Sequence, residues 1–270
     1  MTDKKIGFIG AGNMGYAMIT GIVNSGAAAP GNIAACDTDE EKIQKLHLDF
    51  NLRVTDNPAV LAEFADIIFI AVKPDDFTAA AREAAPFVND KKIIISAAAG
   101  IRIRDMEAIF GNDKKIARTM PNTPALAREG MTAVCFNGNV TPKEQEYALL
   151  LLNAFGKARV IPEKLFHSAI GISGSSPAYV FMFIEAMADA AVRDGMPREQ
   201  AYTFAAQAVY GSAKLLMESG KHPGALKDMV CSPGGTTVEA VAALEKHGFR
   251  AAVMEGVRAC IEKSRGMEGS

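Results

Sequence analysis

Short apolar segments alternate with helical patterns over the first 160 residues, and this alternation limits the possible folds more than any other feature. Residues 67–72 are apolar throughout, as in a strand covered on both faces. The pattern predicts an α/β fold with a doubly wound parallel sheet and helices on both faces. The expected strands are residues 6–9, 33–36, 67–72, 93–96, 115–119, 132–136 and 158–161, and the expected helices are 13–25, 39–48, 57–63, 75–85, 102–109 and 142–155.

The pattern changes after Pro162, and no further strand is expected there. Helices are expected at 176–194, 197–218, 236–247 and 249–264. We therefore predict two domains, residues 1–162 and an all-α domain of residues 163–270. Residues 179–184 are apolar on every side of their helix, and such a helix must be buried all round. A small helical domain cannot cover it alone, so the sequence predicts a homodimer formed through this domain.

Composition restricts the function classes. The 270 residues are 49% hydrophobic and 22% charged, which excludes a disordered chain. The net charge is −2 and no Lys/Arg-rich block is present, so we expect no nucleic-acid partner. No apolar stretch reaches the roughly 18 residues of a membrane span, so we expect no membrane association.

The four cysteines are widely spaced, and no histidine cluster accompanies them. This spacing argues against a structural zinc and against a disulfide framework, so we expect no metal. Unpaired thiols favour a reducing compartment, and the N-terminal residues do not resemble a signal peptide. The expected location is the cytoplasm.

A glycine motif, Gly10-Ala-Gly-Asn-Met-Gly15, lies between the first expected strand and the first expected helix. Gly10 permits a tight turn, Gly12 lets the backbone approach a pyrophosphate, and Gly15 lets the helix pack closely. Asn13 and Met14 open the helix, whose free N–H groups favour an anion. The motif predicts a dinucleotide site, and its strand–turn–helix context argues against a turn without a ligand.

Asp37 follows the second expected strand, where a carboxylate accepts hydrogen bonds from the adenine ribose. A carboxylate there repels a 2′-phosphate, which favours NADH, although NADPH stays open. In the alternative interpretation, Asp37 or Thr38 caps the helix expected at 39–48.

Two further loops follow expected strands. In a doubly wound sheet, ligands bind beyond the carboxyl ends of the strands. We therefore assign both loops to the cofactor, although a solvated lysine and a plain structural turn are the alternatives. The assigned residues are Ala71, Val72, Lys73 and Pro74 in the first loop, and Met120, Asn122 and Thr123 in the second.

A Pro-Gly-Gly loop opens directly onto the helix expected at 236–247. Backbone N–H groups of Gly234, Gly235 and Thr236 are expected to point at one spot, which suits a small carboxylate. Thr236 and Glu239 also match a capping box, the purely structural interpretation. That interpretation leaves the hydroxyl of Thr237 free for a ligand.

These segments together resemble the pyrroline-5-carboxylate reductases, over residues 5–263. The resemblance rests on Gly7–Gly15, Ala71–Pro74, Met120–Pro124, Ser173–Tyr179 and Asp228–Thr237. It implies a Rossmann domain, a helical dimerisation domain and dimers that can assemble into a decamer. The implied reaction is reduction of 1-pyrroline-5-carboxylate to L-proline by NADPH or NADH, the last step of proline biosynthesis.

The resemblance also implies roles for the Pro-Gly-Gly loop. Gly234, Gly235 and Thr236 would hold the substrate carboxylate, and Ser232 would also contact the substrate. Thr237 would hydrogen-bond the ring nitrogen as the catalytic residue. The acid at Asp37 departs from relatives that use NADPH well, which carry small or hydroxyl residues at that position.

Two other classes of protein share some of these features. β-Hydroxyacid dehydrogenases share this architecture but use a Lys followed four residues later by Asn on the interdomain helix. Residues 176–194 contain neither residue type, and no base for an alcohol substrate is evident. A dinucleotide-binding regulator would be expected to have a degraded glycine loop or no substrate loop, and both loops are intact.

Overall fold

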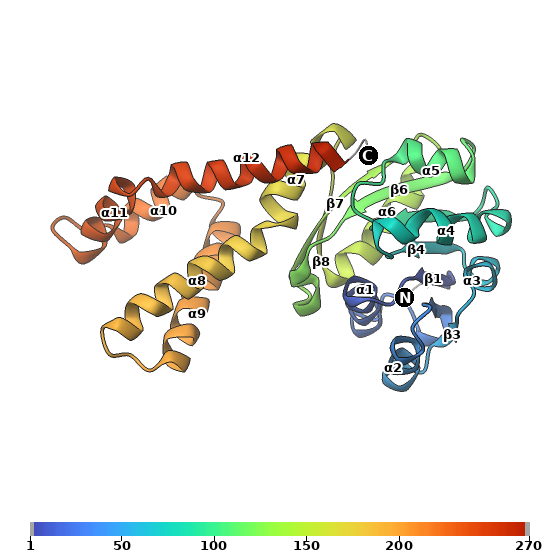
Figure 1. Ribbon diagram of the computed structural model, residues 1–270, viewed down its shortest axis with the longest axis horizontal. Coiled ribbons are helices and arrows are strands. Elements are labelled where there is room, and N and C mark those ends of the chain that lie inside the picture. The colour runs from blue at the N-terminus through green and yellow to red at the C-terminus, as the bar shows by residue number, and fades with distance from the viewer. Residues whose placement is uncertain (1–2, 268–270) are drawn as a thin grey trace. The chain divides into compact units, whose positions relative to one another are not determined.

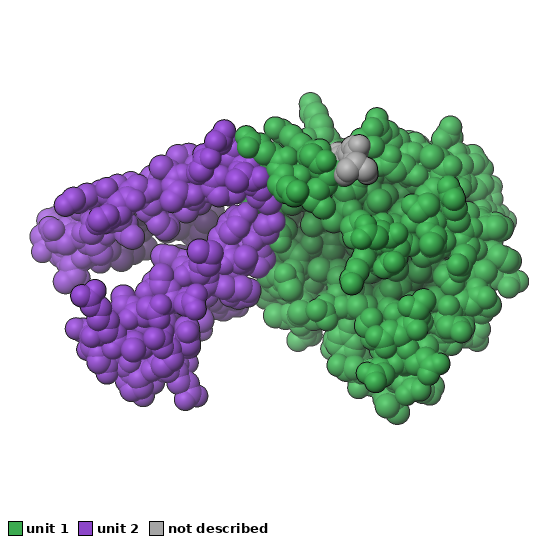
Figure 2. Space-filling view, viewed as in Figure 1, with its two compact units in different colours: residues 1–174, 261–270 green, residues 175–260 purple. Residues whose placement is uncertain are grey.

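The computed structural model describes residues 3–267. The chain divides into two compact units (Figure 2). The first unit runs to Gly174 and resumes at Ile261, and the second comprises Ser175–Cys260.

The first unit is built on one eight-stranded sheet with the order β3-β2-β1-β4-β5-β6-β7-β8 (Figure 1). β2 and β3 are added on one side of β1 and the later strands on the other side, as in a doubly wound sheet. The predicted Rossmann-type fold is confirmed. The strands are β1 (Ile6–Ile9), β2 (Ile33–Cys36), β3 (Arg53–Thr55), β4 (Ile67–Ile70), β5 (Ile93–Ser96), β6 (Lys115–Met120), β7 (Gly130–Phe136) and β8 (Gly156–Val160).

The sheet departs from the prediction at two strands. β7 pairs antiparallel with β6, although a parallel sheet was expected. Only residues 121–129 join these strands, and a parallel crossover needs about a dozen residues or more. β3 was not predicted, because its three residues lie at the sheet edge and are exposed or half-buried, so they form no apolar run.

Helices cover both faces of the sheet. Ile67 and Phe69 of β4 join one core cluster with residues of α1, whereas Ile68 and Ile70 join a second cluster with residues of α3 and α4. This alternation explains why the whole strand is apolar. The α-helices of this unit are α1 (Asn13–Asn24), α2 (Glu40–Phe50), α3 (Pro58–Phe64), α4 (Pro74–Ala84), α5 (Ile103–Phe110), α6 (Pro142–Leu152) and α7 (Phe166–Ala169).

Short helical turns complete the first unit. A π-helical segment, η6 (Ile170–Gly174), continues α7 to the end of the unit. The 3₁₀ turns are η1 (Pro30–Asn32), η2 (Ala85–Phe87), η3 (Thr123–Ala127), η4 (Asn153–Phe155) and η5 (Glu163–Leu165).

The second unit is helical, as predicted. Its helices are α8 (Ser176–Arg193), α9 (Arg198–Ser219), α10 (Pro223–Val230), α11 (Thr236–Lys246) and the first part of α12 (Phe249–Met267). α10 was not predicted, because His222-Pro-Gly224 was interpreted as a break. The imidazole of His222 instead accepts a hydrogen bond from the Gly224 N–H and caps this helix, with Pro223 at its first position.

Large apolar side chains of the second unit are exposed. Phe181 and Met182 of α8 are 64% and 68% exposed, and Phe204 of α9 is 68% exposed. Ala188 is the one buried residue of α8 within the described chain. The burial that the apolar helix requires is therefore not provided within this chain.

Candidate functional site

The glycine loop between β1 and α1 has the geometry that its sequence predicts. Gly10 has a φ of +101°, and a Cβ atom there would lie 2.7 Å from the carbonyl carbon of Ala71. A Cβ atom on Gly15 would lie 2.1 Å from the carbonyl oxygen of Gly10. Both positions therefore require glycine. Gly15 brings α1 against Gly10, the residue that directly follows β1, which agrees with the expected close packing of the helix.

Gly12 differs, because a Cβ atom there would meet no atom within 4 Å among the described residues. Its backbone is extended, with a φ of −64°, so the chain itself does not require glycine here. Gly12 caps α1 without a side-chain hydrogen bond, and the amides of the first helical turn face an open approach. The loop therefore fits a pyrophosphate, which needs close contact with the backbone.

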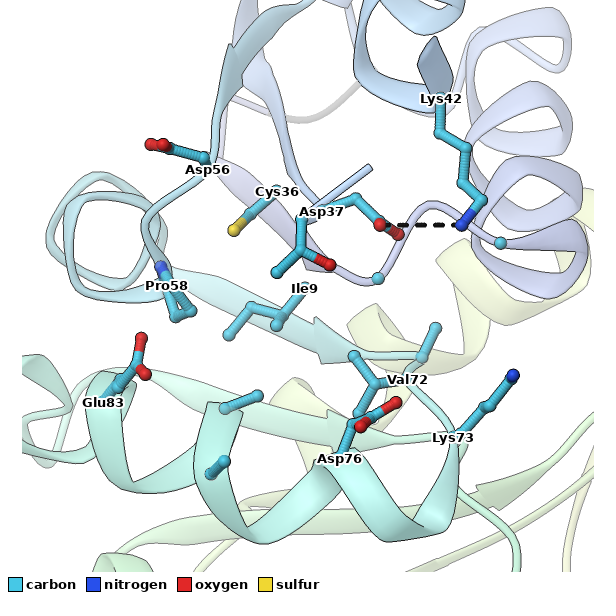
Figure 3. Close-up of a pocket in the computed structure, with 16 residues that line it drawn as sticks. Ile9, Cys36, Asp37, Lys42, Asp56, Pro58, Val72, Lys73, Asp76 and Glu83 are labelled. Atoms are coloured by element: carbon cyan, nitrogen blue, oxygen red, sulfur yellow. Dashed lines mark ion pairs between the residues drawn. The ribbon is translucent and has the colours of Figure 1, made fainter. Parts of the chain in front are cut away.

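A cavity of about 530 Å³ lies beside this loop, at the carboxyl ends of β1, β2 and β4 (Figure 3). Predicted residues that line it are Gly10, Gly12, Asp37, Ala71, Val72 and Lys73. Further lining residues, which sequence reasoning did not identify, are Ile9, Cys36, Thr38, Lys42, Asp56, Pro58, Asp76, Ala79, Ala80 and Glu83. Asp76, Ala80 and Glu83 could have been predicted, because their spacing places them on one face of α4, which follows the predicted loop.

Asp37 connects the glycine loop to the turn after β2. Its Oδ2 accepts a hydrogen bond from the Ala11 N–H at 2.7 Å, and its Oδ1 accepts one from the Asp39 N–H at 3.0 Å. The expectation that Asp37 or Thr38 caps α2 is wrong. Asp39 is the cap, and its side chain accepts from the N–H groups of Glu41 and Lys42.

Lys42 lies between two carboxylates at the edge of the cavity. Its Nζ is 3.0 Å from Oδ2 of Asp39 and 3.7 Å from Oδ1 of Asp37. The hydrogen bond with Asp39 raises the pKa of the Lys42 ammonium, and the same contact lowers the pKa of Asp39. Both groups are therefore charged at neutral pH.

Cys36 forms an uncharged part of the cavity wall. Burial raises the pKa of its thiol to about 12, and the neighbouring Asp37 carboxylate adds to this rise. The thiol is protonated at neutral pH, so Cys36 offers a small apolar surface and no nucleophile.

The predicted residues after β4 and β6 have different surroundings. Lys73 is exposed and precedes α4, and Pro74 is the first residue of that helix. Asn122 is buried, donates from Nδ2 to the Ser173 carbonyl at 3.0 Å and accepts from the Met131 N–H at 2.8 Å. Its amide thus holds the loop after β6 against η6. Asn13, Met14, Gly15, Pro74, Met120, Asn122 and Thr123 are not among the residues that line the cavity.

The Pro-Gly-Gly loop of the second unit leads into α11. Gly234 has a φ of +66°, and the Gly235 N–H donates to the Ser232 carbonyl at 3.1 Å. The Gly235 amide therefore closes the turn, and it does not point at the carboxylate site that the sequence predicted for it.

The predicted capping box at the start of α11 is also wrong. Gly235 is the N-cap and Thr236 is the first helical residue. Among the described residues, no side chain caps this helix by a hydrogen bond. The Thr236 and Thr237 amides at this end suit an anion. Thr237 is half-buried, and Ser232, Gly234 and Thr236 are exposed.

The described residues contain neither a metal cluster nor a membrane-spanning helix. No group of three or more His, Cys, Asp or Glu side chains there could hold a metal ion. None of the helices over residues 3–267 is long and apolar enough to cross a membrane.

Comparison with known proteins identifies the family. Residues 163–267 match the family described as pyrroline-5-carboxylate reductase dimerisation, and residues 5–100 match that described as NADP oxidoreductase, coenzyme F420-dependent. The chain is 52% identical to the pyrroline-5-carboxylate reductase of Escherichia coli (strain K12), over 99% of this chain and 100% of that protein. It is 40% identical to the enzyme of that name from Methanosarcina acetivorans, over 98% of each chain.

A solved structure agrees with these relatives. The structure of Plasmodium falciparum pyrroline carboxylate reductase with NADP bound matches with a TM-score of 0.90 and 34% identity, over 100% of both chains. The fold, both matched regions and the full-length relatives lead to one conclusion. The chain belongs to the pyrroline-5-carboxylate reductase family.

Proposed function

We propose that this protein reduces 1-pyrroline-5-carboxylate to L-proline with NADPH or NADH as the donor, the last step of proline biosynthesis. The observation that carries the proposal is the open glycine cradle at Gly12, beside a cavity of about 530 Å³. Relatives named for this reaction match the chain from end to end.

The cofactor residues are those that surround the glycine cradle and the adjoining strand ends. Gly10, Gly12 and Gly15 shape the loop around the pyrophosphate, with Asn13 and Met14 at the start of α1. Asp37 receives the adenine ribose, Ala71, Val72 and Lys73 form the opposite wall, and Pro74 begins α4 directly after them. Met120, Asn122 and Thr123 support the nicotinamide end, where Asn122 acts by holding its loop in place.

The substrate residues are those of the Pro-Gly-Gly loop. The uncapped start of α11 binds the substrate carboxylate through the Gly234 and Thr236 amides, and Ser232 and Gly235 keep the turn in shape. Thr237 directs its hydroxyl to the ring nitrogen. Because Gly235 bonds to Ser232, its contribution is structural.

The chemistry needs positioning more than a strong acid. The bound cofactor supplies a hydride to the imine carbon, and the nitrogen carries a proton in the product amine. The protonated imine is accessible in solution, so Thr237 serves as an orienter or proton relay. Holding the reactants in line is worth up to about 7–11 kcal/mol.

The assembly and location follow from the same proposal. The exposed apolar side chains of α8 and α9 are covered by a second copy, in a homodimer formed through the helical domain. Dimers can assemble further into a decamer. We retain residues 1–162 as the dinucleotide-binding domain and residues 163–270 as the dimerisation and substrate domain, in a cytoplasmic enzyme.

The direct test is turnover of 1-pyrroline-5-carboxylate by the purified full-length protein, followed by nicotinamide absorbance. NADH and NADPH are compared side by side, and the product is identified as proline. Oxidation of either cofactor that depends on the imine supports the proposal. Cofactor binding without turnover contradicts the substrate assignment.

A further inference from the structure

We propose that Asp37, Asp39 and Lys42 act together to select NADH over NADPH. The selection combines two effects. Asp37 occupies the space of a 2′-phosphate with negative charge, and Asp39 engages the nearest cation that could neutralise such a phosphate. This inference rests on the proposed function only in that a nicotinamide dinucleotide occupies the cavity.

Asp37 is held firmly in its position. Both of its oxygens accept backbone hydrogen bonds, from Ala11 at 2.7 Å and from Asp39 at 3.0 Å. Its side chain is 12% exposed, so it cannot swing into solvent without leaving two N–H groups unpaired. A carboxylate fixed after β2 accepts from a ribose 2′-hydroxyl, which donates, but repels a phosphate, which does not.

Lys42 is the cation beside Asp37 in the cavity, and it forms ion pairs with Asp39 and Asp37. Its Nζ lies 3.0 Å from Asp39 and 3.7 Å from Asp37, and Figure 3 shows it facing the Asp37 carboxylate. Enzymes that bind NADP place a cation against the 2′-phosphate after this strand. Here the cation is shared by two carboxylates, so the corner keeps a net negative charge.

The rest of the cavity adds to this field. Its lining carries the carboxylates Asp56, Asp76 and Glu83 besides Asp37, against the ammonium groups of Lys42 and Lys73. A phosphate that carries up to two further negative charges therefore meets a surface of the same sign. The ribose hydroxyl of NADH carries no charge and avoids this repulsion.

The test is a set of dissociation constants, because binding is read without substrate. NADH and NADPH are titrated separately into the full-length protein, with nicotinamide fluorescence or calorimetry as the readout. We expect wild-type protein to bind NADH at least about tenfold more tightly than NADPH, since like-charge contacts dominate the difference.

Three variants separate the parts of the proposal. Asp37→Asn keeps an acceptor for one N–H group and should shift the NADPH preference by about tenfold or more. Asp39→Asn preserves the cap of α2, because Asn is as good an N-cap as Asp, and it leaves Lys42 with Asp37 as its one remaining carboxylate of the pair. Lys42→Gln should change NADPH affinity little in the wild-type background. It should cancel the gain in the Asp39→Asn background.

Glu83→Gln is the matched control, because it removes one negative charge from the same cavity on a different element. Equal shifts from Glu83→Gln and Asp37→Asn would mean that general charge sets the preference, and would overturn the assignment to Asp37. A loss of NADPH affinity in Lys42→Gln alone would overturn the role of Asp39, because the lysine would then already be available.

Failure of this inference is distinguishable from failure of the proposed function. Wild-type protein that binds NADPH as tightly as NADH overturns the inference and leaves the reductase proposal intact. Selective NADH binding without imine reduction does the reverse. Binding of neither cofactor contradicts both.

Discussion

Single glycines in the same loop have different physical roles. Gly10 and Gly15 are required by the chain itself, because a Cβ atom at either position would collide with backbone atoms. Gly12 has ordinary backbone angles and open space beside it, so its absence of a side chain serves something outside the chain. The motif therefore combines folding and binding requirements within six residues.

This difference predicts opposite effects for two substitutions. Gly12→Val should lower the free energy of unfolding by about 1 kcal/mol at most, the cost of a poorer N-cap, while it weakens cofactor binding at least about tenfold. Gly10→Ala should lower that free energy by about 2 kcal/mol or more, because of its positive φ and the close Ala71 carbonyl. Denaturant unfolding and a cofactor titration on both variants measure this. Equal loss of stability in both variants would contradict the division of roles.

At the substrate loop, Thr237→Ala should lower kcat by about tenfold or more, whereas cofactor affinity should change little. In the proposed function this hydroxyl orients the ring nitrogen, and Thr237 lies in α11, a different element from the glycine cradle. Steady-state kinetics and a separate cofactor titration provide the measurement. Thr236→Ser is a suitable control, because it retains the backbone amide and a hydroxyl at the exposed neighbour. A parallel loss of cofactor binding in Thr237→Ala would refute the assigned role.

Among the elements, α3 has an unusual C-terminal stabilisation. Lys92 is the residue directly before β5, and its side chain is buried. Its ammonium donates hydrogen bonds to the carbonyls of Ala62, Glu63 and Ala65, at 2.7, 3.1 and 2.7 Å. Burial lowers the pKa of this lysine. The last carbonyls of a helix have no partners within the helix, so one side chain supplies what α3 lacks.

Lys92→Met should therefore lower the free energy of unfolding by about 2–4 kcal/mol, because the apolar stem remains while buried carbonyls lose their donor. Lys91→Met is the control, since Lys91 is exposed, and its effect should stay within about 0.5 kcal/mol. Denaturant unfolding monitored by circular dichroism compares the two variants. Equal effects would show that the ammonium of Lys92 contributes nothing to α3.

At the scale of the whole molecule, the second unit exposes large apolar side chains that a folded protein normally buries. Phe181, Met182 and Phe204 are each more than 60% exposed, and they belong to the region that matches a dimerisation family. Several large apolar side chains exposed on one unit indicate an interface. The helical unit therefore depends on a second copy for the burial of α8.

Phe181→Glu should weaken self-association at least about 100-fold, because a two-fold interface contains each substitution twice. Leu48→Glu is the control, since Leu48 is an 82% exposed apolar residue of α2 in the first unit. Sedimentation velocity over a range of concentrations should show a shift to monomer for Phe181→Glu alone. An unchanged profile for that variant would place the interface elsewhere.

The order of most strands and helices, the glycine cradle and the change to helices after Pro162 could all be predicted from the amino-acid sequence. These features depend on local periodicity and on backbone angles that few residues adopt, so they can be read from neighbours in the chain. β3 and α10 were not predicted. The exposed edge strand β3 has no apolar run, and the proline that begins α10 was interpreted as a helix break.

Contacts between groups that are distant in the chain became visible with the three-dimensional fold. It showed that Asp37 bonds to Ala11, that Asp39 caps α2, and that Lys42 is shared between the two acids. It also reversed β7 against β6, and it made Gly235 the N-cap of α11, so the capping box of Thr236 and Glu239 does not form. Such contacts depend on loop lengths and on competition among several possible partners. No single stretch of sequence encodes the result of that competition.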